Sequence, residues 1–233
     1  GQTSHKNGQS STCEQVYHCA WCDSSSSEQN RANQVPPGTL NLLANPSGEM
    51  GLSQWAQMNP RVSWQVENCD VPPNENVTTN FVSSYQWCVM AQGVQLNRIA
   101  HDPSQLRLEV SAKYMSRTDC PSVFRMEVVV LDRRRTPIHR ETTPVLEAPL
   151  DFWGRSVLTV EPTEGAHEII VIVHGKDKRF WQGNFGSKVS DICVRILGTD
   201  ETLDQQLIEP NTYRNEATAR NLQDNVGEPR QHV

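Results

Sequence analysis

Long hydrophobic runs are missing from this sequence of 233 residues. No stretch of about 18 consecutive apolar residues occurs, so the sequence predicts no membrane-spanning helix. The N-terminus also lacks the apolar stretch that is typical of a secretory signal. We therefore expect an intracellular, cytoplasmic protein.

The sequence has no excess of positive charge. It contains 21 Lys and Arg against 27 Asp and Glu, which gives a formal net charge of −6. Proteins that bind nucleic acid through its phosphates usually carry a basic patch or a basic overall charge. The charge balance therefore argues against a nucleic-acid partner.

Cysteine and catalytic motifs are both scarce. The seven cysteines amount to about 3% of the chain, well below the ~8–10% of a disulfide scaffold, and their number is odd. The seven histidines are scattered, and no nucleophile elbow, zinc-protease motif, phosphate-binding loop or dinucleotide fingerprint occurs. We expect neither a disulfide framework nor an enzyme, and no cofactor is implied.

Large apolar residues are absent from the first part of the chain. Residues 1–38 contain no Leu, Ile, Phe or Met, and such a segment cannot offset the entropy cost of ordering its backbone. Residues 198–233 carry seven acids against three arginines, with Leu203, Leu207 and Ile208 spaced for one weak helical turn. We predict a disordered polar tail over 1–38, a domain over 39–197, and an acidic, mostly disordered tail over 198–233. Solvation is the default role of the acidic tail, and docking as a strand or helix is the alternative.

Within residues 39–197 the hydrophobic period is two. Apolar residues alternate with polar ones over 106–113 and 124–130, and again over 192–196, as in strands with one buried face. The continuous apolar run Ile169–Val173 is typical of a central strand that is covered on both faces. Turn-like segments separate these strands. The pattern predicts an all-β fold, an antiparallel β-sandwich.

One cluster in the N-terminal segment has ligand chemistry. Cys13, His18, Cys19 and Cys22 include a Cys-x-x-Cys pair with the spacing of a zinc knuckle. A structural zinc site needs a second ligand pair returned by a folded loop, whereas these residues all lie close together in a polar segment. Zinc binding, reversible acylation or other thiol chemistry, and no specific role all remain open, and we predict no metal site.

Gly1 begins a segment that partly matches a myristoylation signal, although His5 occupies the position where Ser or Thr is preferred. A single acyl chain binds membranes only marginally. Palmitoylation of one of the nearby cysteines would supply the second anchor. This pattern raises the hypothesis of peripheral membrane association through an acylated N-terminus.

A Phe-Trp pair lies in a polar segment between two predicted strands. Phe180 and Trp181 are surrounded by Lys, Gly and Asn within residues 174–186. Aromatic side chains presented on such a loop suit stacking on a sugar ring or gripping a peptide. The alternative is that the pair folds back and covers the end of the sandwich.

Five ordered blocks of this sequence resemble the F-box-associated domain family. They are Leu40–Leu52 with Trp55, Trp64–Glu67, Phe81–Cys88 with Ala91 and Gln92, Tyr114 with Ser116–Asp119, and His174–Lys188. The resemblance implies a galactose-binding-like β-sandwich of the jelly-roll type. It agrees with the strand pattern, which was derived independently.

The resemblance also implies a non-catalytic recognition function. In better-known members the domain follows an F-box that docks onto a ubiquitin-ligase adaptor, and some members bind the chitobiose core of high-mannose N-glycans. The polar residues 1–38 are not expected to form an F-box, so the chain resembles most the nonspecific cytotoxic cell receptor protein branch. The partner is then a protein or glycoprotein. The alternatives are a glycoprotein receptor linked to ubiquitin-dependent degradation and a membrane-associated receptor of cytotoxic cells in innate immunity.

Some residues of the family's sugar pocket have counterparts in this sequence. Phe81, Phe180 and Trp181 match its aromatic residues, with Phe180 at a position that is usually Tyr. Gln182 stands where glycan-binding members have Lys, and Ala112 where they have Asp. Loss of two charged hydrogen-bonding groups predicts glycan binding weakened by about 100-fold or more.

Overall fold

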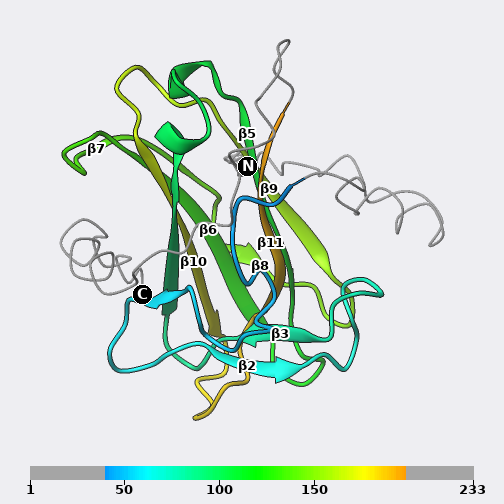
Figure 1. Ribbon diagram of the computed structural model, residues 1–233. Helices are drawn as coiled ribbons and strands as arrows, with labels where there is room; N and C mark the ends of the chain where they lie inside the picture. The colour runs from blue at the N-terminus through cyan, green and yellow to red at the C-terminus, as the bar shows by residue number, and fades with distance from the viewer. Residues whose placement is uncertain (1–39, 198–233) are drawn as a thin grey trace, which may run out of the picture. The chain divides into compact units, whose positions relative to one another are not determined.

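The computed structural model describes residues 40–197, and these residues form an all-β structure. Apart from two short 3-10 turns, η1 (Leu96–Arg98) and η2 (Pro103–Gln105), the regular elements of this part of the chain are all strands (Figure 1). The strands are β1 (Ala56–Gln57), β2 (Gln65–Asn68), β3 (Thr79–Val82), β4 (Cys88–Gln95), β5 (Leu108–Met115), β6 (Ser122–Leu131), β7 (Pro137–Thr142), β8 (Leu146–Glu147), β9 (Gly154–Val160), β10 (Glu168–Asp177) and β11 (Lys188–Ile196).

The strands form two antiparallel sheets. The first sheet has the order β1-β4-β10-β6-β7, with β8 also paired to β6, and the second has the order β2-β3-β11-β5-β9. From β3 to β6, and again from β9 to β11, each strand lies in the opposite sheet from the strand before it. This alternation between two packed sheets is the jelly-roll arrangement. The predicted antiparallel β-sandwich is confirmed.

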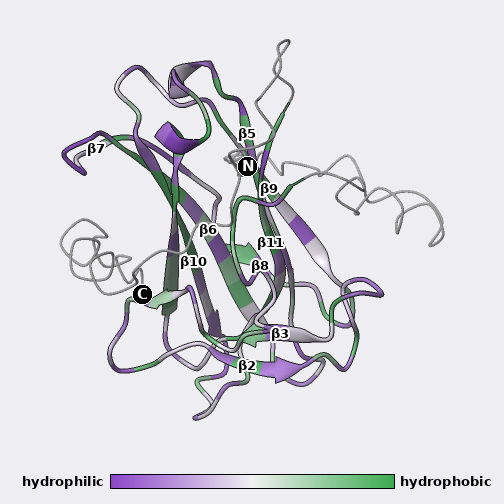
Figure 2. Ribbon diagram, in the orientation of Figure 1, coloured by the Kyte–Doolittle hydropathy of each residue, from purple (hydrophilic) through white to green (hydrophobic). Residues whose placement is uncertain are grey.

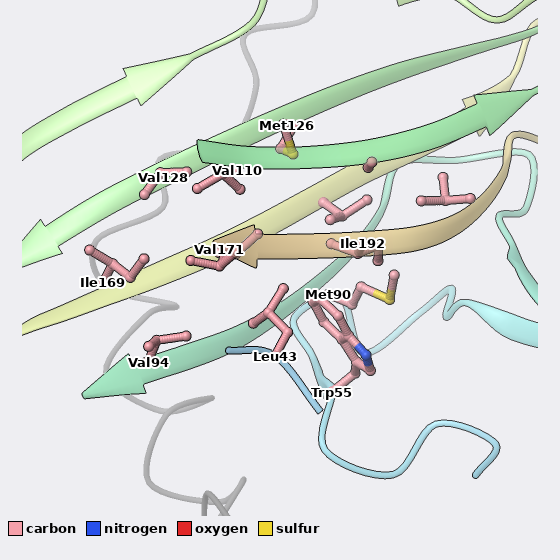
Figure 3. Close-up of a cluster of buried hydrophobic side chains, with 14 of the residues drawn as sticks. Leu43, Trp55, Met90, Val94, Val110, Met126, Val128, Ile169, Val171 and Ile192 are labelled. Atoms are coloured by element: carbon pink, nitrogen blue, oxygen red, sulfur yellow. The ribbon is translucent and has the colours of Figure 1, made fainter. Parts of the chain in front are cut away.

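The main core lies between the two sheets. Met126 and Val128 of β6, Ile169 and Val171 of β10, and Ile192 of β11 point into it (Figure 3). The intervening residues of β10, Ile170 and Ile172, belong to a second buried cluster on the other face of the same sheet. β10 is thus buried on both faces, as its continuous apolar run predicts. Figure 2 shows hydrophobic residues along β6 and β10, whereas β2 is largely hydrophilic.

The segment just before β1 closes one open edge between the sheets. Leu42 N–H donates to Val194 O of β11 at 2.8 Å. On the opposite sheet, the Gln92 side chain of β4 accepts from Ala44 N–H at 2.7 Å and donates to Ala44 O at 2.9 Å. Residues 40–42 therefore lie near the end of β11. The chain enters and leaves the domain at the same end of the sandwich, which we call the chain-end pole.

The opposite end, where β10 ends and β11 begins, is called the loop end here. The loops β3–β4, β5–β6 and β10–β11 meet at it: Asp177 N–H donates to Ser84 O at 3.0 Å, and Lys178 N–H donates to Pro121 O at 2.8 Å.

No helix within residues 40–197 is long and apolar enough to cross a membrane. The four cysteines in this part of the chain are all free thiols.

Candidate functional site

The β10–β11 loop is built on the side chain of Asp177. Its Oδ1 accepts hydrogen bonds from the backbone N–H groups of Arg179 at 2.8 Å and Phe180 at 2.5 Å. Asp commonly folds a local turn in this way. Phe180 takes a φ of +58°, an uncommon value for a residue with a large side chain. The turn held by Asp177 stabilises this conformation and fixes where the aromatic pair begins.

The rest of the loop is tied to neighbouring segments. Ser84 Oγ donates to Gly183 O at 2.7 Å, and Asn184 Nδ2 donates to Val82 O at 3.1 Å. Gly186 lies so close to Ser83 that a Cβ at this position would approach Ser83 Oγ to 2.2 Å, so only glycine fits. These contacts fix the position of the β10–β11 loop relative to the rest of the sandwich.

This loop presents its aromatic pair to solvent. Phe180 is 67% exposed and Trp181 is 41% exposed, whereas Trp55 and Trp64 are buried in the core. Trp181 rests edge-to-face on Phe185, with 6.2 Å between ring centroids. The sequence allowed either exposure of the pair on the loop or packing against the end of the sandwich, and the structure shows both rings exposed.

Cations lie against the aromatic rings at the loop end. Lys176 Nζ lies 5.1 Å from the centroid of the Trp87 ring and 5.7 Å from that of Phe180. The Arg179 guanidinium lies 5.7 Å from the Trp181 ring centroid. Such cation–π contacts restrict the ring orientations and place hydrogen-bond donors beside an apolar surface. The site therefore combines stacking faces with polar groups that can orient a ligand.

Arg117 and Asp119, from the β5–β6 loop, flank the aromatic rings. The Arg117 guanidinium lies 5.2 Å from the centroid of the Phe185 ring and forms a bidentate pair with Asp119 at 2.8 and 2.9 Å. Hydrogen bonding to Arg117 lowers the pKa of Asp119. The carboxylate is thus held ionised and in a fixed orientation next to the β10–β11 loop.

A shallow cleft of about 240 Å³ opens beside this pair, on the outer face of the second sheet. Lys188 lies within it, ion-paired to Glu67 at 2.9 Å and to Asp70 at 3.3 Å. Burial acts to lower the pKa of Lys188, but these two acids outweigh it and raise the pKa. The cleft shares Arg117 and Asp119 with the loop end, so the two features form one continuous surface.

The predicted site residues do not all reach the surface. Phe180, Trp181 and Gln182 lie together and exposed on the β10–β11 loop. Phe81 is 0% exposed and packs on Trp55 with ring centroids 5.8 Å apart, and Ala112 is 1% exposed in the main core. Both face inward, so neither is part of the exposed surface that Phe180, Trp181 and Gln182 form. The period-two pattern of residues 106–113 already placed Ala112 on the buried face.

Several residues that contribute to the loop end were not singled out as site residues. They are Trp87, Arg117, Asp119, Lys176 and Phe185. All lie at strand ends or in loops within or next to the blocks that resemble the F-box-associated family. Alternate strands of an antiparallel sandwich end at the same pole. The position of these residues at the ends of predicted strands could therefore have indicated that they lie close together.

The N-terminal candidates fall outside the described residues. This applies to Gly1 and to the cluster of Cys13, His18, Cys19 and Cys22. Among residues 40–197, no group of three or more His, Cys, Asp or Glu side chains is arranged to hold a metal ion.

The family model for the F-box associated region matches residues 35–196. The chain belongs to the F-box associated family. F-box only protein 27 of Mus musculus is 28% identical over 168 residues, which cover 67% of this chain and 59% of that protein. F-box only protein 44 of Mus musculus is 28% identical over 171 residues, covering 67% of each chain. F-box only protein 2 of Bos taurus is 27% identical over 173 residues, covering 67% of this chain and 58% of that protein.

The F-box associated domain of this chain also resembles a domain of solved structure. The enzymatically active domain of tailspike protein 4 from bacteriophage CBA120 superposes with a TM-score of 0.50 and 15% sequence identity, covering 67% of this chain and 21% of that one. At this identity the likeness concerns the fold alone.

Proposed function

We propose that the loop end of this F-box associated domain binds carbohydrate on a glycoprotein partner, with Phe180 and Trp181 as its stacking platform. The observation that carries the proposal is the exposure of two adjacent aromatic rings, 67% and 41%, on a loop held by Asp177. Sugar rings have an apolar face that packs on aromatic rings and hydroxyl groups that need fixed polar partners. The recognition is non-catalytic.

Polar groups around the platform support the same function. Gln182 is exposed next to Trp181, and the Arg117–Asp119 pair lies beside Phe185. Because Ala112 is buried, its lack of a carboxylate does not weaken a surface pocket. Of the two replacements, only Gln182 in place of Lys removes a charge from the exposed site. The expected loss of glycan affinity relative to family members with Lys is then about 10-fold to 100-fold.

Calorimetric titration of the protein with chitobiose tests this proposal. We expect a measurable heat of binding that Trp181→Ala weakens by about tenfold or more, since one well-packed aromatic contact contributes more than about 1 kcal/mol. Ile138→Ala is the matched control, because Ile138 is 38% exposed on β7 near the chain-end pole, away from the loop end, and is expected to leave binding unchanged. Absence of binding at millimolar chitobiose, or equal losses in both variants, would contradict the proposal.

We also propose that the bound glycoprotein is brought to a ubiquitin ligase. The support is the membership of this chain in the F-box associated family and the similarity to F-box only proteins. A pull-down of purified ubiquitin-ligase adaptor by the full chain, alone and with a candidate glycoprotein, tests this role. Failure to recover the adaptor in either case would contradict the link to a ubiquitin ligase and leave only glycoprotein binding as the proposed function.

A further inference from the structure

The cleft on the outer face of the second sheet holds more acidic than basic side chains. Four carboxylates and two basic groups lie in or against it: Glu67, Asp70, Asp119, Asp151, Arg117 and Lys188. Arg117 pairs with Asp119, and Lys188 pairs with both Glu67 and Asp70. Asp151, on the β8–β9 loop, is exposed and forms no ion pair within residues 40–197. Two negative charges are therefore left in excess, which favours a cationic ligand.

A buried acceptor at the same cleft lacks a donor. Asn80 lines the cleft and is 0% exposed, and its Nδ2 donates to Glu67 Oε1 and to Phe81 O, each at 3.1 Å. These two bonds fix the orientation of the amide, because the reverse orientation would set an oxygen against two acceptors. Asn80 Oδ1 then has no hydrogen-bond partner among the described residues. A ligand that carries N–H groups supplies the missing donor.

The size and the apolar walls of the cleft fit one long side chain. Its volume of about 240 Å³ lies below the ~300–1,000 Å³ of pockets that enclose drug-sized ligands. Val71, on the β2–β3 loop, and Met115, at the end of β5, line it with apolar groups. Lys and Arg side chains combine a hydrocarbon stem with a cationic head that has several N–H donors. The stem matches Val71 and Met115, and the head matches the excess carboxylates and Asn80 Oδ1.

We propose that this cleft binds a lysine or arginine side chain from the polypeptide of the partner protein. The site takes a cation rather than a sugar ring, so it stands whether or not Phe180 and Trp181 bind carbohydrate. Because the cleft and the loop end share Arg117 and Asp119, one partner can occupy both. Contacts at two adjacent sites reinforce each other, since the second is made within a complex that has already formed.

Methyl NMR of the full chain with labelled methionine tests the proposal. The sequence has five methionines, and Met115 is the one that lines the cleft. The probes are the blocked tripeptide acetyl-Gly-Arg-Gly-amide and its lysine and citrulline versions, because citrulline keeps the shape of arginine without its charge. We expect a cationic peptide to shift the Met115 resonance at millimolar concentration and to leave Met90 and Met126, in the main core, in place. The citrulline peptide should bind at least about tenfold more weakly.

Asp151→Asn tests the charge without disturbing the loop. Asp and Asn both adopt a φ such as the +65° of Asp151 more readily than other residues that carry a Cβ. The variant should bind the preferred cationic peptide about threefold or more weakly, as expected for the loss of one partly exposed ion pair. Glu161→Gln is the matched control, because Glu161 is a 70% exposed acid just after β9, at the chain-end pole. It should leave the affinity unchanged.

Three results would overturn the proposal: a Met115 resonance that neither cationic peptide shifts, equal binding of the citrulline and cationic peptides, or equal affinity of Asp151→Asn and the native protein. A Met115 shift caused by chitobiose alone falls under the first of these, and it would assign the cleft to the sugar site. Failure of chitobiose to bind, with the cationic peptides still shifting Met115, would contradict the sugar proposal and support this one.

Discussion

The side chain of Glu127 carries a carboxylate at a fully buried position on β6. Arg125 contacts it at 2.6 Å, Arg140 forms a second ion pair, and His174 Nε2 lies 3.7 Å away. Burial acts to raise the pKa of Glu127, but these neighbours outweigh it and lower the pKa from 4.5 to about 2. A carboxyl whose folded-state pKa is depressed stabilises the fold above its unfolded pKa, and this contribution is lost as the pH falls.

Glu127→Gln is therefore expected to remove a pH-dependent part of the stability. At pH 7 the variant should unfold with a free energy lower by about 3 kcal/mol, because each pKa step is worth about 1.4 kcal/mol. The difference between the native protein and the variant should shrink between pH 4.5 and pH 2. Urea unfolding at pH 7 and pH 3 measures it. A constant difference at both pH values would show that Glu127 acts through packing alone.

At the scale of the element, β10 depends on a glycine where it passes Trp64. A Cβ on Gly175 would lie 2.7 Å from Cη2 of the Trp64 ring, which is fully buried. Gly175→Ala is expected to lower the unfolding free energy by about 1–3 kcal/mol, the usual cost of overpacking a core. Denaturant unfolding of Gly175→Ala, Trp64→Phe and the double variant measures the coupling. Because Phe lacks the clashing atom, the two changes should be less than additive, and strict additivity would contradict the steric cause.

The β10–β11 loop is an element whose shape depends on Asp177. Asp177→Ala removes the acceptor of the Arg179 and Phe180 N–H groups and should weaken sugar binding at the proposed site. Asp177→Asn keeps an oxygen at the same place and should retain most of the binding. Calorimetric titration of both variants, with circular dichroism to monitor folding, compares them. Equal binding by the two variants would show that the turn does not position the aromatic pair.

The strands were predictable because their period is local, whereas the site was predictable only in part. The run Ile169–Val173 indicates burial on both faces without any knowledge of the partner strands. The polar residues around Phe180 and Trp181 made their exposure one of two alternatives, and the structure shows both rings exposed. A match to a motif does not reveal which face of a strand a residue occupies, and Phe81 lies on the inward face of β3. The contact of Arg117 with Phe185 joins residues far apart in the sequence, and no local pattern encodes it.

At the scale of the whole molecule, the domain is stabilised without covalent links among the described residues. Cys88 and Cys193 are buried free thiols, and burial raises the pKa of each to about 11. Their reaction with a thiol reagent at pH 8 should be at least about 100-fold slower than that of an exposed cysteine, because little thiolate forms. Labelling followed by mass spectrometry identifies the modified residues. Rapid labelling of either cysteine in the native protein would indicate that the core opens readily.

Reducing agent should accordingly leave the melting temperature unchanged, which differential scanning calorimetry with and without reductant can verify. A drop in melting temperature on reduction would reveal a disulfide that involves cysteines outside residues 40–197.

Leu42 pairs with Val194 near the end of β11, so the two ends of the domain lie next to each other, at the pole opposite Trp181. The chain ends and the proposed binding loop therefore lie at opposite poles of the domain. The domain can be inserted into a loop of another protein, or fixed to a sensor surface through either end, without obstructing the aromatic platform.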